Sequence, residues 1–67
     1  MTNIQHINYT CLTYSADGKT VTGSTPFATA GEAIARAETW RAVGRKAVAV
    51  ETCYNWEFHE FFHKELA

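Results

Sequence analysis

The sequence predicts an α+β domain in which a β-hairpin, a helix and a third strand (ββαβ) form a three-stranded antiparallel or mixed sheet packed on that helix, followed by a short C-terminal helix. Two observations support this class. Residues 3–14 and 46–52 are rich in β-branched and aromatic residues, and residues 30–43 repeat apolar residues at helical spacing. A chain of 67 residues is expected to form one small globular domain, residues 1–67.

The hairpin is predicted from two strands, residues 3–14 and 19–25. The Asp-Gly pair between them ends at Gly18, which can adopt the positive φ that a tight hairpin turn needs. We expect a three-residue loop, because this register places Val21 on the same face as Cys11. The polar residues of the first strand would then face solvent on the other side.

The main helix is predicted over residues 30–43. Thr29 and Glu32 have the spacing of a capping box, and Gly44 is a helix-stop signal. The apolar stripe of this helix consists of Ala30, Ala33, Ile34, Ala37 and Trp40. Because most of these side chains are small, the helix axis can approach a sheet closely.

A third strand is predicted over residues 46–52, with Val48 and Val50 pointing toward the helix. A right-handed crossover through the helix would place this strand beside the first one, on the side away from the second. The expected sheet order is therefore second, first, third.

The C-terminal segment allows two interpretations. A helix over residues 56–65 would have Asn55 as its cap. Its apolar stripe would be Phe58, Phe61, Phe62 and Leu66. A strand would alternate at Trp56 and Phe58 and then lose its alternation at the two adjacent phenylalanines. The helix is the preferred interpretation.

The same segment contains "HEFFH", His59 to His63, which matches the H-E-x-x-H pattern of zinc peptidases. Those enzymes need a third metal ligand from further along the chain, and four residues follow His63 here. The pattern is interpreted as a solvated helix face, and we expect no catalytic residue, no metal and no cofactor. A structural zinc site that adds Cys53 or His6 is the alternative.

The cysteine count, the lengths of the apolar segments and the net charge indicate the cellular compartment and the class of partner. Two cysteines, Cys11 and Cys53, are too few for a secreted disulfide scaffold, so we expect buried thiols and a cytoplasmic protein. We find no segment of transmembrane length, so no membrane association is expected. Six basic and seven acidic residues nearly cancel, which disfavours direct binding of nucleic acid.

Two groups of residues are candidates for binding a protein partner. One is the basic group around the end of the main helix, since arginine and tryptophan often dominate binding energy. The other is the C-terminal phenylalanines, which exceed what so small a core can bury and also predict a homodimer. The candidate residues are Arg36, Trp40, Arg41, Arg45, Lys46, Phe58, Phe61 and Phe62.

The order hairpin, capped helix and strand, followed by a short aromatic tail, resembles small proteins with which phages and other mobile elements disable host defence, anti-CRISPR proteins among them, and the resemblance covers residues 4–52. The resemblance is one of element order and assigns no site residue. It implies a non-enzymatic inhibitor that covers a surface of a larger protein complex in the cytoplasm of a bacterial host. A small nucleic-acid-binding module is the alternative, followed by a zinc-binding protein that uses the HEFFH segment.

Overall fold

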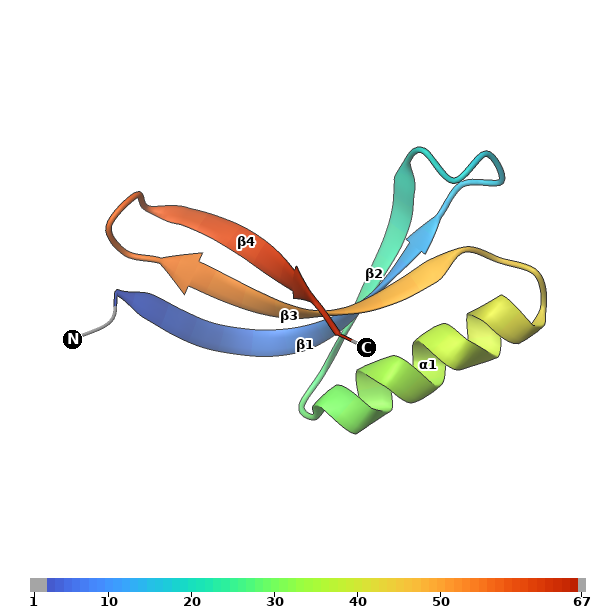
Figure 1. The fold of residues 1–67 in the computed structure, drawn as a ribbon, viewed down its shortest axis with the longest axis horizontal. Helices are drawn as coiled ribbons and strands as arrows, with labels where there is room; N and C mark the ends of the chain where they lie inside the picture. The colour runs from blue at the N-terminus through green and yellow to red at the C-terminus, as the bar shows by residue number, and fades with distance from the viewer. Residues whose placement is uncertain (1–2, 67) are drawn as a thin grey trace.

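The computed structural model describes residues 3–66, which form a four-stranded antiparallel sheet with one helix on one face (Figure 1). The elements are β1 Ile4–Tyr14, β2 Val21–Phe27, α1 Ala30–Ala42, β3 Ala47–Asn55 and β4 Glu60–Glu65. The strand order is β2-β1-β3-β4. The α+β class and the order of the first three strands are confirmed, and the sheet has one strand more than predicted.

The turn between β1 and β2 is built by local side-chain contacts. Gly18 has φ 73°, as the Asp-Gly signal predicted. Asp17 Oδ1 accepts hydrogen bonds from the Lys19 N–H at 3.0 Å and from the Ser15 hydroxyl. These contacts order a loop of residues 15–20, which is longer than the predicted one.

The longer loop changes the register of the hairpin. Tyr14 lies opposite Val21, and a bulge separates this pair from Thr13, which lies opposite Gly23. Val21 therefore lies on the face of the sheet away from the helix, here called the open face. Its predicted place beside Cys11 is wrong.

Helix α1 begins and ends as predicted. Thr29 Oγ1 accepts a hydrogen bond from the Glu32 N–H at 3.3 Å and donates one to Glu32 Oε1 at 2.8 Å. Gly44, with φ 83°, follows the last turn and donates its N–H to Arg41 O at 3.0 Å. No helix within residues 3–66 combines the length and the apolar character needed to cross a membrane.

The core lies between α1 and the sheet. Ala33 and Ala37 have no exposed surface and pack on three small residues of the strands. These three are Cys11, Ala47 and Ala49. Larger side chains surround this small-residue contact, namely Tyr9, Phe27, Ile34, Trp40 and Leu66. Small residues on both sides let the helix lie close to the sheet, as the alanine stripe predicted.

The orientation of β3 differs from the prediction. Ala47 and Ala49 face the helix, so Val48 and Val50 lie on the open face. The two alanines and the two valines are all apolar, so the alternation of side chains along β3 does not determine whether the alanines or the valines face the helix. The alanine contact on α1 leaves room only for the smaller set. Val50 is nevertheless 4% exposed, because its neighbours on the open face cover it.

The predicted C-terminal helix over residues 56–65 is wrong. Glu60–Glu65 forms β4, with Phe62 opposite Cys53 and Phe61 opposite Tyr54. A helix here would leave the outer N–H and C=O groups of β3 without partners, whereas β4 pairs with them. Trp56 to His59 form the intervening turn.

Candidate protein-binding surface

An aromatic cluster occupies the open face at the end of the sheet where β3 turns into β4, the end opposite the β1–β2 turn (Figure 1). The Tyr54 ring centroid lies 4.7 Å from that of Trp56 and 4.8 Å from that of Phe61, in edge-on contacts. The Trp56 Nε1–H donates a hydrogen bond to Gln5 Oε1 on β1 at 2.9 Å. We call Tyr54, Trp56, Phe61 and the adjacent turn residue Phe58 the aromatic tip.

Three of the four residues of the aromatic tip are exposed although their rings are large and apolar, and Tyr54 is half-buried beneath them. Trp56 is 54% exposed, Phe61 64% and Phe58 66%. Exposed clusters of this kind mark interaction surfaces, because contiguous apolar area on a small soluble domain is otherwise buried.

The backbone of the tip is ordered by the turn. Asn55 Oδ1 accepts the N–H groups of Glu57 at 2.9 Å and Phe58 at 3.4 Å, which is an Asx turn. His59 then takes the left-handed conformation, φ 52°, that returns the chain into β4. The predicted helix cap Asn55 therefore organises a hairpin turn, and this turn fixes the backbone from which Trp56 and Phe58 project.

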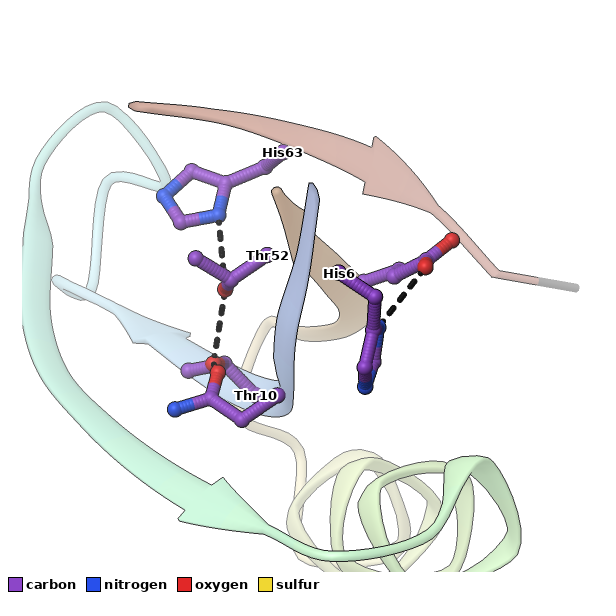
Figure 2. A network of polar contacts seen from close by, with 6 residues as sticks. His6, Thr10, Thr52 and His63 are labelled. Carbon is purple, nitrogen blue, oxygen red and sulfur yellow. Dashed lines mark hydrogen bonds and ion pairs between the residues drawn. The ribbon is translucent and has the colours of Figure 1, made fainter. Parts of the chain in front are cut away.

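A chain of polar groups lies beside the tip on the open face (Figure 2). The Thr10 hydroxyl donates to Asn8 Oδ1 at 2.9 Å, and its oxygen lies 2.9 Å from that of Thr52. Thr52 Oγ1 in turn lies 3.1 Å from His63 Nδ1. The Thr10 hydroxyl has one proton, which it donates to Asn8, so the Thr52 hydroxyl must be the donor to Thr10. The Thr52 oxygen then accepts a hydrogen bond from the Nδ1–H of His63.

These polar groups line a shallow hollow of about 590 Å³. Its wall consists of Asn8, Thr10, Leu12, Val21, Ser24, Pro26, Thr52 and His63. Thr10 was expected to face solvent, but it is only 7% exposed, and its hydroxyl is satisfied within the chain. The hollow therefore lies on the open face next to the aromatic tip, and its buried hydroxyl, that of Thr10, already has a hydrogen-bond partner within the chain.

A second polar contact lies on the helix side of the sheet. The register of β1 shifts between His6 and Asn8, which puts His6 on the same face as Tyr9, with ring centroids 4.7 Å apart. His6 Nδ1 lies 2.8 Å from Glu51 Oε2 (Figure 2). This hydrogen bond lowers the pKa of Glu51 below its ordinary value.

The lowered pKa of Glu51 predicts a pH dependence. Ionised Glu51 stabilises the fold at neutral pH, and this contribution is lost as the pH falls through its folded-state pKa. We expect Glu51→Gln to be less stable at neutral pH and to lose less of its free energy of unfolding between about pH 5 and pH 3. Urea unfolding at several pH values measures this. Glu38→Gln, on an exposed part of α1, is the control and should keep the wild-type slope. A wild-type slope in Glu51→Gln would contradict the prediction.

The HEFFH segment does not lie on a helix. His59 is in the turn and points its ring toward Trp56, with centroids 6.4 Å apart, whereas His63 is in β4 and contacts Thr52. The two imidazoles therefore contact different residues of the hairpin and are not paired on one helix face as in a zinc peptidase.

The two cysteines, Cys11 and Cys53, are free and 1% exposed, and burial raises the pKa of both thiols. They are buried small side chains, as predicted.

The predicted basic group is stacked within the chain. Arg36 lies 5.7 Å from the Phe27 ring centroid, and Arg45 lies 5.6 Å from that of Trp40, which is half-buried against the core. Contacts of this kind hold the guanidinium groups over rings of their own domain.

The other two basic residues of the group bind backbone carbonyls. The Arg41 Nε–H donates to Ala47 O at 3.1 Å, so its guanidinium reaches the start of β3. Lys46 Nζ lies 4.6 Å from the Tyr14 ring centroid and donates to Gly18 O at 3.2 Å. The first contact joins α1 to the start of β3, and the second joins the residue before β3 to the β1–β2 loop.

The structure thus divides the predicted binding residues between two ends of the domain. Phe58 and Phe61 belong to the aromatic tip, and Phe62 is half-buried on the helix side. The residues missed from the sequence are Tyr54, Trp56 and Gln5. Their alternating positions would have indicated them only if the segment had been interpreted as a strand.

Comparison with protein-family models, with curated proteins and with solved structures found no match to this chain.

Proposed function

We propose that this chain is a non-enzymatic protein-binding inhibitor that acts by covering a surface of a larger protein complex, with the aromatic tip as its anchor. The observation that carries the proposal is the aromatic tip, in which the exposed rings of Trp56 and Phe61 pack on Tyr54 and the exposed Phe58 follows in an ordered turn. The class of target expected from the resemblance is a bacterial defence complex.

The aromatic tip can supply more binding free energy than the basic group. Aromatic residues at the centre of an interface often contribute the largest share of binding energy, because they bury much apolar area and have few rotatable bonds. Here Trp56 is already held by Gln5 and Tyr54, so less side-chain entropy is lost when a partner binds. The basic group offers less binding energy, because Arg36, Arg45 and Lys46 are already stacked on rings of the same chain and Arg41 already donates to a carbonyl.

Charge supports a protein partner over a nucleic acid. The acidic residues Glu57 and Glu60 flank the exposed rings of the tip, and a phosphate backbone would be repelled there. The basic residues Arg41, Arg45 and Lys46 lie in the last turn of α1 or just after it. They are therefore away from the aromatic tip, on which the bases of a nucleic acid would stack.

The proposal is tested by affinity capture from a bacterial lysate with matched variants. We expect the wild-type chain to retain a multisubunit nuclease of a defence system, and Trp56→Ala or Phe58→Ala to lose it. With the purified target, each change should weaken binding by about 30-fold, equivalent to about 2 kcal/mol. Calorimetric titration measures the affinity.

Two controls locate the interface. Val43→Ala removes another exposed apolar side chain, 72% exposed and distant from the tip, and should bind like the wild type. Arg41→Ala with Arg45→Ala should also leave affinity nearly unchanged. Loss of binding in the arginine variant alone would place the interface at the basic end, and retention of bulk RNA or DNA would replace the proposal with the nucleic-acid module.

A further inference from the structure

The two edges of the sheet differ in their capacity to pair with another strand. β2 forms one edge and β4 the other. Tyr14 donates its N–H to the carbonyl of Lys46, the residue just before β3, so the alternate residues Cys11 and Thr13 direct their backbone groups toward β2. Their partners Thr25 and Gly23 point back toward β1, which leaves Pro26 pointing outward. Proline has no N–H, so the β2 edge is blunted.

The β4 edge has no such block. Leu66 donates its N–H to Ala49 O on β3 at 2.8 Å. Alternate residues of an antiparallel strand direct their N–H and C=O groups to the same side, so Phe61 and His63 direct theirs away from β3. This edge therefore offers hydrogen-bonding groups in the spacing that an added antiparallel strand requires.

The sequence of β4 is complementary to itself in one symmetric register. If a two-fold axis passes through Phe62, Phe61 of one copy lies opposite His63 of the other, and these are the residues whose backbone groups point outward. In the same register Glu60 lies opposite Lys64 of the second copy, and symmetry repeats this pair. Opposite charges directly across a strand pair stabilise it, and like charges destabilise it.

Other symmetric registers do not place Glu60 opposite Lys64. A two-fold axis at His63 would set Lys64 against Phe62 and Glu65 against Phe61, with no opposite charges facing each other. Within residues 3–66 the only close ion pair is His6 with Glu51. Lys64 lies opposite Glu51 on β3, and its charge helps to lower the pKa of Glu51, but it forms no close ion pair there. Glu60 and Lys64 can therefore both form an ion pair across the interface.

We propose that two copies of this chain associate through antiparallel pairing of β4 with β4, in the register centred on Phe62, to form a continuous eight-stranded sheet. The two Phe62 side chains meet on the helix side, where cross-strand aromatic pairs are favourable. Phe61 of each copy meets His63 of the other on the open face. This contact engages the Phe61 of each aromatic tip, whereas Trp56 and Phe58 precede β4 and stay outside the paired residues, at opposite ends of the interface. The partner-binding proposal is tested with Trp56 and Phe58, so its failure and the failure of the dimer are distinguishable.

Charge reversal tests the register. We expect Glu60→Lys alone and Lys64→Glu alone to weaken self-association by about tenfold or more, because two attractive pairs become two repulsive ones. An equimolar mixture of the two variants should dimerise as strongly as the wild type, and so should the double variant Glu60→Lys, Lys64→Glu. Sedimentation equilibrium from about 1 μM to about 1 mM covers the affinity range of small interfaces. Far-UV circular dichroism checks the fold of each variant.

Amide hydrogen exchange provides a test that needs no variant. The N–H groups of Phe61 and His63 should become protected as protein concentration rises, whereas the outward N–H of Ser24 on the blunted β2 edge should not. A wild-type chain that stays monomeric to about 1 mM would overturn the proposal. The proposal would also be overturned if the single charge-reversal variants dimerised with wild-type affinity. The same holds if the N–H groups of Phe61 and His63 stayed unprotected in the dimer.

Discussion

Ala37→Leu should destabilise this domain strongly, whereas Ala35→Leu on the same helix should not. Ala37 has no exposed surface and lies in the small-residue contact between α1 and the sheet. Three added heavy atoms force the helix away from Ala49 and Cys11 or push side chains out of favourable rotamers. Overpacking of this kind costs about 1–3 kcal/mol, a large part of the stability of so small a domain.

Thermal unfolding followed by circular dichroism measures the effect. A loss of this size lowers the midpoint by about 4–8 °C for each kcal/mol in a domain of this size. Ala35 is exposed, and leucine has nearly the helix propensity of alanine, so the control isolates packing from propensity. Equal midpoints for the two variants would contradict the close contact between helix and sheet.

Val50→Ala should cost about 1.5–2.5 kcal/mol, from the transfer free energy of two methyl groups and the cavity they leave. Val50 faces away from the helix, yet it is only 4% exposed, between Thr10 on β1 and Glu65 on β4. The result would show that the open face contains part of the core.

Val43→Ala is the matched control for this change. Val43 is 72% exposed, and the same substitution there should alter the free energy of unfolding by less than about 0.5 kcal/mol. Urea unfolding of both variants measures the difference. If Val50→Ala unfolds with the same free energy as Val43→Ala, then burial on the open face contributes nothing to stability.

Local signals predicted the elements whose ends are determined by nearby residues. The capping box of Thr29 and Glu32 and the stop at Gly44 define α1, because their hydrogen bonds and dihedral angles involve neighbours in the chain. The positive φ of Gly18 was predictable for the same reason.

The candidate site was predicted only in part, because its residues converge through strand pairing. Phe58 and Phe61 were expected to bind a partner, but Trp56 reaches Gln5 across most of the chain length. Residues 56–65 contain apolar positions that fit both a helix and a strand, and the pairing with β3 decides between them. The helix interpretation hid the cross-strand contact of Tyr54 with Phe61.

The sequence by itself determined the α+β class, the capped helix, the first hairpin and the adjacency of β1 and β3, because capping, turn chemistry and crossover handedness are local or general rules. Only the tertiary structure decided which face of β3 meets the helix and whether the last segment is a strand. Val48 and Val50 alternate with alanines, so both faces of β3 are apolar, and the close approach of Ala33 and Ala37 selects the smaller side chains. The backbone groups on the outer side of β3 need partners, and this long-range requirement makes the C-terminal segment β4 and assembles the aromatic tip.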